Sequence, residues 1–504
     1  MKLKSLNFLQ NFSKEKKGQK KKIVLCHGDY DFIHLGHIKH FQAAKKLGDY
    51  LIVSITGDAK MQKGINRPIY KEKDRIEFLS LLSIVDYLYV DQNISAVEVI
   101  SKIKPNYYVK GIDYLKFKND ISGNILKEKK IVEKYGGKLS FTDEESFSAS
   151  SLINKFNLDR GLIALIEKLK KSYNFHKVKK IIDGMLNKKV LVIGDTIIDE
   201  YVYVKGLGKP SKENIVASLY DYKELFLGGL FACLGNISLF CNNVDFITVI
   251  GTGKKDYQFI KKNIPKNIKK KIFLKNKFPI TKKTRYIERT HANLQKLYEI
   301  YEMKDDPLSK HNEKKIINYL NRNLPKYDFV IVNDYGHGLL TKKIINIICK
   351  KSKFSAVNVQ INAGNRGYNL VTKYKKASYY CVDMDEAKFA LQDKYIKADK
   401  IPKSILKITK GENISITMGQ KGSMSYLPKN KTFYMPSFTN VVVDTMSAGD
   451  SYFVMSSMLL YLSKSVQLSA FMGNLSGAIT VGVPGCVPIE KAKFFETLNT
   501  LLKT

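Results

Sequence analysis

The sequence predicts an α/β protein built from two doubly wound domains. Short apolar runs alternate with segments of helical spacing, which is typical of parallel βαβ units. This alternation runs through the first 150 residues, fades into a helical passage, and starts again at "NKKVLVIGDTIIDEY". A chain of 504 residues also exceeds the size at which a single hydrophobic core usually stops growing.

The domain boundaries follow from where the alternation starts and stops. We expect a basic, solvated arm at residues 1–21, a first α/β domain at 22–156, a helical connection at 157–187 and a second α/β domain at 188–504. In the second domain, "VASLYDYKELFLGG" has the two-sided alternation that is typical of a small antiparallel lid sheet.

Composition narrows the class of partner and compartment. The formal net charge is +38, but the lysines are spread along the chain, which favours biased composition over a nucleic-acid partner. Six cysteines lie far apart without a CxxC pair, which favours reduced thiols over a zinc site. Since we find no secretory signal and no apolar run of spanning length, we expect a cytoplasmic protein without membrane insertion.

The stretch "HGDYDFIHLGHIKH" combines a strand end, a glycine turn and the start of a helix. This arrangement places His34 and His37 about one helical turn apart beside unpaired backbone N–H groups, which favour an anion. A zinc site would need a third ligand at matching spacing, and Cys26 is the one candidate. The pattern therefore favours a phosphate site, with a metal site or ordinary surface histidines as alternatives.

The same stretch resembles the GxFDxxHxGH signature of the nucleotidyltransferase family that includes cytidylyl- and adenylyltransferases, with Tyr30 in place of the usual phenylalanine. The resemblance implies that catalysis rests on His34, His37 and Lys110 and that Lys63 contacts the substrate. It assigns nucleotide binding, with ATP or CTP, to Gly28, Tyr30, Asp31, Arg75, Gly111, Asp113, Ser148 and Ser150.

Near the C-terminus, "VVVDTMSAGDSYF" places a carboxylate at the start of an apolar helical run. Asp450 follows Ala448 and Gly449, so a small-residue turn would expose amides to an anion beside a group able to deprotonate a hydroxyl. An aspartate at a helix start is also an ordinary capping residue, and local sequence leaves both interpretations open.

This stretch resembles the DTxGAGD motif of ribokinase-like carbohydrate kinases, with Ser447 where the first glycine of GAGD is expected. The resemblance implies that Asp450 is the base and that Glu386 organises Mg²⁺. It assigns the ATP site to Gly419, Gly422, Ala448, Gly449 and Asn474. It assigns the sugar-phosphate site to Asp199, Gly228, Gly229, Lys283 and Arg285.

Together the two domains resemble bifunctional ADP-heptose synthases with the domain order reversed. That resemblance implies a sugar-phosphate kinase joined to a sugar 1-phosphate nucleotidyltransferase. The departures at Ala232, Asp383 and the stretch "VQINAGNRG" leave the substrate and kinase turnover open. Ser447, Ala232 and Asp383 favour an alternative in which the second domain only binds sugar or mediates self-association. A nucleic-acid-binding protein is the lesser alternative, and the oligomeric state is left open.

Overall fold

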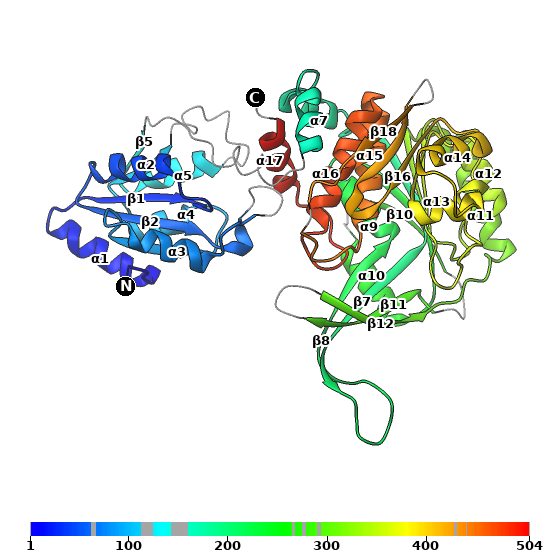
Figure 1. The fold of residues 1–504 in the computed structure, drawn as a ribbon, viewed down its shortest axis with the longest axis horizontal. Coiled ribbons are helices and arrows are strands. Elements are labelled where there is room, and N and C mark those ends of the chain that lie inside the picture. Colours follow the sequence, from blue (N-terminus) through cyan, green and yellow to red (C-terminus); the bar gives the residue numbers. More distant parts are fainter. Residues whose placement is uncertain are drawn as a thin grey trace. The chain divides into compact units, whose positions relative to one another are not determined.

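The computed structural model describes residues 2–61, 67–111, 124–142, 160–264, 268–274, 279–289, 294–427, 431–439 and 441–502. The chain divides into two compact units, one made of Met1–Leu158 with Lys491–Lys503 and the other of Asp159–Glu490 (Figure 1). The last helix, α17 (Lys491–Leu502), is thus counted with the first unit. We describe each unit by itself.

The first unit contains a parallel five-stranded sheet of order β3-β2-β1-β4-β5. Its strands are β1 (Ile23–Gly28), β2 (Tyr50–Thr56), β3 (Tyr87–Asp91), β4 (Tyr107–Gly111) and β5 (Lys138–Thr142). The order reverses between β1 and β4, which makes the sheet doubly wound, as the sequence predicts. Ligands of such sheets bind beyond the carboxyl ends of the strands at the reversal, where Gly28 and Gly111 lie.

Helices cover both faces of this sheet. One apolar cluster joins the sheet to α2 (Leu35–Lys45) and α3 (Glu72–Leu81). The other joins it to α1 (Leu6–Gly18), α4 (Val97–Ile103) and α5 (Asn124–Lys134). The βα connection after β1 therefore leads directly into α2, the helix that carries the histidine motif.

The expectation of a solvated arm at the N-terminus is wrong, because residues 6–18 form helix α1. Leu9 is fully buried and Phe12 is 9% exposed, and the hydroxyl of Ser13 donates to the carbonyl of Ile103 at 2.6 Å. These three side chains share one helix face by their spacing, whereas most of the lysines lie elsewhere on the helix. The many lysines hid an amphipathic pattern.

The second unit contains a nine-stranded sheet of order β10-β9-β6-β13-β14-β15-β16-β17-β18. Neighbours from β10 to β16 are parallel, and β17 and β18 are added antiparallel. The strands are β6 (Lys189–Gly194), β9 (Asn243–Ile250), β10 (Lys269–Leu274), β13 (Phe329–Asp334), β14 (Ser355–Val359), β15 (Tyr379–Asp383), β16 (Asn413–Thr417), β17 (Ser423–Leu427) and β18 (Lys431–Met435).

A separate four-stranded sheet of order β12-β11-β7-β8 confirms the expected lid. It consists of β7 (Thr196–Gly208), β8 (Ala217–Gly229), β11 (Lys282–Arg289) and β12 (Leu294–Glu302), and Figure 1 shows the long β7–β8 ribbon. The sheet is mixed, since β11 runs parallel to β7 while the other two pairs are antiparallel.

The second unit also contains ten α-helices among its described residues, two of which come before the first strand of the nine-stranded sheet. They are α7 (Arg160–Lys170), α8 (Phe175–Asp183), α9 (Leu230–Ser238), α10 (Lys254–Asn263), α11 (Lys310–Asn323), α12 (Lys342–Lys351), α13 (Met384–Leu391), α14 (Ile401–Thr409), α15 (Ala448–Ser463) and α16 (Val466–Thr480). Eleven consecutive side chains of α15, from Asp450 to Leu460, are buried, so most of this helix lies inside the unit. Among the described residues, no helix combines the length and apolar character needed to cross a membrane.

Candidate active sites

The N-terminus of α2 is organised by His34, which is its N-cap residue. Its ring Nδ1 accepts the N–H of Gly36 at 3.1 Å, so the proton of the neutral ring lies on Nε2. Burial lowers the pKa of His34, which keeps the ring neutral at neutral pH. His34 therefore has an N–H donor free of the capping bond, at a helix end that attracts anions.

The rings of His34 and His37 lie together, with centroids 4.0 Å apart. Tyr30 packs edge-on against His37 at 5.4 Å and is almost fully buried. Its φ of +46° turns the ring over Gly28, where an added Cβ would lie 3.1 Å from the ring. The structure therefore places Gly28 and Tyr30 beneath the histidine pair, where they shape the turn.

Two other predicted nucleotide contacts bind the protein itself. Asp31 pairs with Arg67 and accepts the N–H groups of Ile69 and Tyr70 at 2.7 and 3.0 Å. Arg75 is 2% exposed and donates to the carbonyl of Asp29 at 2.5 Å. Both side chains thus hold the turn between β1 and α2 in place. Arg67 was not identified from the sequence, although it follows Lys63 in the stretch "KGINRP".

Arg75 also bonds Asp58 Oδ1 at 2.7 Å, which ties the end of β2 to the same turn. Gly111 ends β4 and is paired in register with Thr142 of β5. Four predicted residues, Lys63, Asp113, Ser148 and Ser150, lie outside the described residues. Within the described part of the chain, no group of three side chains is arranged to hold a metal ion.

Lys110 lies near the end of β4, which pairs with β1, the strand that contains His27. Its ammonium donates to the carbonyl of His27 at 3.2 Å and lies 3.7 Å from Glu128 Oε2 on α5. Burial raises the pKa of Glu128, but Lys110 and its other partners outweigh burial, so the pKa is lowered overall. Lys110 is therefore a cation held beside the reversal point of the sheet.

The remaining two histidines of the motif stretch have partners in the fold. His27 Nδ1 lies 3.1 Å from the hydroxyl of Ser54, and His40 Nδ1 lies 2.8 Å from that of Thr142. Burial lowers the pKa of His40 to about 4, so it is neutral at neutral pH. Only His34 and His37 are brought together as a pair.

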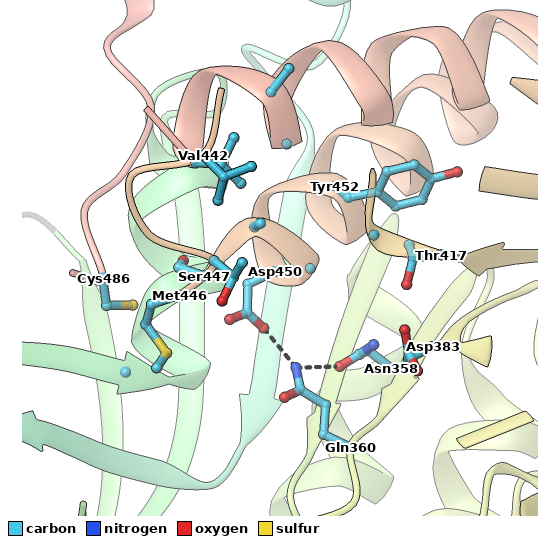
Figure 2. A pocket seen from close by; sticks show the side chains of 18 of the residues that line it. Asn358, Gln360, Asp383, Thr417, Val442, Met446, Ser447, Asp450, Tyr452 and Cys486 are labelled. Carbon is cyan, nitrogen blue, oxygen red and sulfur yellow. Dashed lines mark hydrogen bonds between the residues drawn. The ribbon is translucent and has the colours of Figure 1, made fainter. Parts of the chain in front are cut away.

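In the second unit, one cavity of about 450 Å³ is lined by all twelve residues that the sequence assigns to the kinase site. Figure 2 shows Asp450 in this cavity. The twelve residues come from the four-stranded sheet, the segment between β16 and β17, and the helices α13, α15 and α16. They are Asp199, Gly228, Gly229, Lys283, Arg285, Glu386, Gly419, Gly422, Ala448, Gly449, Asp450 and Asn474. Twelve positions spread over 276 residues of sequence, from 199 to 474, therefore line a single space.

Asp450 lies in the first turn of α15 and is 6% exposed. Its Oδ1 accepts from the side-chain amides of Asn333 and Gln360, each at 3.1 Å. The hydroxyl of Tyr335 lies 3.2 Å from Oδ1 and 3.4 Å from Oδ2. Burial raises the pKa of Asp450 to about 6, although these donors oppose the rise. A carboxyl group with this pKa can accept a proton near neutral pH.

The turn before α15 leaves its amides without a side-chain cap. Ser447 adopts the left-handed conformation with φ +62° and accepts no capping hydrogen bond. Asp444 anchors the turn by accepting the N–H of Met446 at 3.1 Å and the ammonium of Lys296 at 2.8 Å. The amides of Ala448 and Gly449 therefore start a helix inside the cavity, where they can bind an anion.

The lid end of the cavity is charged. Asp199 pairs with Arg285, and a Cβ on Gly228 would collide with the Asp199 carboxylate. Lys283 is 6% exposed, and its ammonium lies 5.0 Å from the centre of the Tyr301 ring. Burial lowers the pKa of Lys283. This end can bind sugar hydroxyls and an anionic group.

Gly229 closes the same end, since its φ of +60° and its closeness to the Asp195 carbonyl exclude a side chain. At the other end, Gly422 has a φ of +88° and packs its Cα against the backbone of Met435. Asn474 donates to the hydroxyl of Ser423 at 2.7 Å, which links α16 to β17. Gly422 and Asn474 thus form part of the cavity lining together with Gly419.

Asp383 and Glu386 form a capping box at the start of α13. The two oxygens of Glu386 accept the N–H groups of Ile361 at 2.9 Å and Asp383 at 2.8 Å. Burial raises the pKa of Glu386 to about 7. Mg²⁺ usually takes one or two carboxylates together with waters and substrate phosphates, so this pair on the cavity wall fits such an ion.

Three side chains that surround Asp450 were not identified from the sequence. Asn333 lies at the end of β13, Tyr335 follows that strand, and Gln360 follows β14. The one available signal was their place at the carboxyl ends of neighbouring strands, where the side chains of a parallel sheet converge on a ligand site.

Comparison with known proteins gives a family for each unit. Residues 25–156 match the cytidylyltransferase-like family, and residues 187–492 match the pfkB family of carbohydrate kinases, which is more than half of the chain. The chain belongs to the pfkB carbohydrate kinase family. It is an enzyme with a nucleotidyltransferase domain followed by a carbohydrate kinase domain.

The curated relatives match the first domain. Bifunctional protein HldE of Campylobacter concisus is 39% identical over 139 residues, which cover 27% of this chain and 29% of that protein. Bifunctional protein HldE of Helicobacter pylori strain Shi470 is 40% identical over 136 residues, with 27% of each chain covered. The chain thus spans less than a third of the length of these relatives.

Among solved structures, ribokinase from Thermotoga maritima is 18% identical, with 61% of this chain and 98% of that chain covered and a TM-score of 0.46. Phosphofructokinase-2 from Escherichia coli is 11% identical, with 63% and 100% covered and a TM-score of 0.48. At these values the likeness adds nothing to the family assignment.

Proposed function

We propose that this chain is a bifunctional enzyme that makes a nucleotide-activated sugar. The kinase domain phosphorylates a sugar phosphate with ATP, and the first domain couples a sugar 1-phosphate to a nucleotide with release of pyrophosphate. The observation that carries the proposal is the single kinase cavity, which combines a base, an amide turn and two buried cations. We extend the proposal to a cytoplasmic enzyme of surface-polysaccharide synthesis.

Phosphoryl transfer follows from this geometry. Asp450 takes the proton of a sugar hydroxyl, and the resulting oxygen attacks the γ-phosphorus of ATP. The amides of Ala448 and Gly449 stabilise the charge on the transferred group, and ADP leaves. Lys283 and Arg285 bind the phosphate already on the sugar. Mg²⁺, held through Asp383 and Glu386, would neutralise charge on the ATP phosphates.

In the first domain, an oxygen of the sugar 1-phosphate attacks the α-phosphorus of the nucleotide. His34 and His37 contact the triphosphate at the start of α2, and Lys110 adds a positive charge nearby. The bond to the departing pyrophosphate breaks as the new phosphoanhydride forms. These side chains act by position and charge, since no covalent protein intermediate is needed.

ATP and a heptose phosphate are the proposed substrates. Their support is the likeness of "KGINRP" and "VKGIDY" to the adenylyltransferase half of ADP-heptose synthases. The test is pyrophosphate release from ATP and from CTP with a panel of sugar 1-phosphates. We expect release with ATP and a heptose 1-phosphate, and release only with CTP would overturn the choice of nucleotide.

A second candidate keeps the nucleotidyltransferase and treats the kinase domain as a sugar-binding module. Ser447, a non-glycine residue at φ +62° in the anion turn, favours this alternative. Phosphorylation of any heptose or hexose phosphate that is lost in Asp450→Asn would reject it. A nucleic-acid role, suggested by charge alone, would require DNA or RNA affinity with a steep salt slope.

A further inference from the structure

The two oxygens of the Asp450 carboxylate have different surroundings. Oδ1 accepts from the amides of Asn333 and Gln360 at 3.1 Å each and from the hydroxyl of Tyr335 at 3.2 Å, and the thiol of Cys233 lies 4.0 Å from it. Oδ2 has one hydrogen-bond partner among the described residues, the same Tyr335 hydroxyl at the longer distance of 3.4 Å. Since a carboxylate oxygen has two acceptor positions, Oδ1 is filled and Oδ2 keeps a position for a proton.

The orientation of Gln360 is fixed by a chain of hydrogen bonds (Figure 2). The amide of Asn358 donates to the backbone carbonyl of Cys381 at 2.9 Å, so its oxygen faces Gln360. Gln360 Nε2 donates to that oxygen at 2.9 Å, and its second hydrogen goes to Asp450. A backbone carbonyl of β15 thus determines that Gln360 presents a donor to the base.

We propose that Gln360 and Tyr335 are positioning residues for phosphoryl transfer, which together with Asn333 fill the acceptor positions of Asp450 Oδ1 so that Oδ2 accepts the hydroxyl proton. This inference rests on the proposed kinase function. In the step, the sugar O–H bond breaks and its proton goes to Oδ2. The oxygen forms a bond to the γ-phosphorus, and the bond from that phosphorus to the bridging oxygen breaks, with its electrons leaving on ADP.

Gln360 comes from "VQINAGNRG", a stretch that departs from the usual strand end of this family. The departure suggested a loss of turnover when only the sequence was considered. In the structure, the same stretch supplies a neutral donor 3.1 Å from the base. The stretch therefore supports catalysis by this chain.

Other titratable groups lie on the cavity walls or against Asp450. They are Asp199 of β7, Cys233 of α9, Lys283 and Arg285 of β11, Asp383 of β15, Glu386 of α13, Tyr452 of α15, and Cys486. Asp199 opposes ionisation of Asp450, and burial keeps the thiols of Cys233 and Cys486 protonated by raising their pKa. The variants below leave all eight groups in place.

The test is the titration of Asp450 in the full-length chain, read from carboxyl-stretch infrared spectra as the difference between each protein and its Asp450→Asn counterpart. Gln360→Met and Tyr335→Phe each remove one donor to the carboxylate. We expect each to raise the pKa of Asp450 by about one unit, the effect of one hydrogen bond to a charged group. Tyr379→Phe, which removes a buried hydroxyl bonded to Ser456 at 2.8 Å, is the matched control without a shift.

Turnover with ATP and the best sugar phosphate gives the second measurement. The pKa that governs the acidic limb of the kcat–pH profile should rise with the titration. Since a rise from about 6 to about 7 lowers the ionised fraction at pH 6 from about one half to about one tenth, kcat should fall about fivefold there while KM for ATP stays within twofold. Thermal unfolding checks that each variant is folded, and either variant suffices. An unchanged titration in a folded variant would overturn the proposal. A shifted titration with no turnover in the wild type would instead reject the kinase function.

Discussion

The helices α2 and α15 each begin at a candidate phosphate site, but only the first turn of α2 has a side-chain cap. In α2, the ring of His34 caps the turn and binds the N–H of Gly36 at 3.1 Å. In α15, Ser447 offers no side-chain cap, so the amides of the first turn are left for a ligand. The nucleotidyltransferase site therefore places its donors on imidazoles, whereas the kinase site places them on the backbone next to a carboxylate.

The side chains at the two helix starts also differ in how deeply they are buried. His34 and His37 are partly exposed, whereas Asp450 is 6% exposed and surrounded by amides. A group that only donates to phosphate can remain near water. A base that must take a proton at neutral pH needs a raised pKa, which burial supplies here. The comparison predicts that each site can be disabled without affecting the other.

The largest expected effect is the loss of phosphoryl transfer in Asp450→Asn. Removing the base should lower kinase turnover by about 10³-fold, within the usual range for general acid–base catalysis. Pyrophosphate release should stay within twofold of the wild type. ADP and pyrophosphate would be measured on the same preparation. Kinase turnover above a tenth of the wild-type value would contradict the assignment of the base.

The reciprocal change is His37→Ala, which removes one of the paired imidazoles. We expect pyrophosphate release to fall by about 10²-fold, as when one charge-stabilising donor is lost, while kinase turnover is unchanged. His311→Ala, an exposed histidine of α11, is the matched control. Normal pyrophosphate release by His37→Ala with the true substrate would show that the phosphate interpretation of this motif is wrong.

A prediction of intermediate size concerns the buried pair of Lys110 and Glu128. Glu128→Gln leaves the ammonium without its carboxylate, which should lower the free energy of unfolding by about 3 kcal/mol. Because the pKa of Glu128 is lowered in the fold, its stabilisation is present above the ordinary carboxyl pKa and is lost as pH falls through the lowered value. The difference between variant and wild type should therefore shrink in acid.

Urea unfolding followed by circular dichroism, at neutral pH and at a series of values from about pH 4 down to about pH 2, measures this difference. Glu133→Gln is the matched control on the same helix, because Glu133 forms an exposed pair with Lys129 at 3.8 Å. We expect its effect to stay below about 0.5 kcal/mol. Equal losses in the two variants would mean that burial of the Lys110 pair has no special weight.

The fold class, and the positions of the two candidate ligand-binding turns at helix starts, could be predicted from the sequence because both are local patterns. The α/β alternation, the HLGH turn and the Ser447–Asp450 turn are each read within about fifteen residues. The hydrogen bonds to Asp450 could not be predicted in this way, since their donors Asn333 and Gln360 come from the ends of two other strands. Their convergence depends on sheet order, which no spacing along the chain encodes.

Helix α1 shows the opposite failure, in which composition obscured a local pattern. Leu9 and Phe12 are spaced as one helix face, but the surrounding lysines made the segment look like a solvated arm. Long lysine side chains lie readily at the edge of an apolar face, so a basic run can still be an amphipathic helix.

The smallest expected effect is at Ser447, the N-cap residue of α15. A substitution there tests whether this helix start differs from that of α2 in having no side-chain cap. A left-handed conformation costs a non-glycine residue about 1–2 kcal/mol, and the entropy of glycine offsets part of that gain. Ser447→Gly should therefore stabilise the kinase domain by about 0.5–1 kcal/mol, whereas Ser447→Ala keeps the strain. The unfolding transition that Glu128→Gln leaves unchanged identifies this domain, since Glu128 belongs to the first unit. If Ser447→Gly were instead destabilising while Ser447→Ala was also destabilising, the serine hydroxyl would be holding the turn, and the start of α15 would resemble the side-chain-capped start of α2 after all.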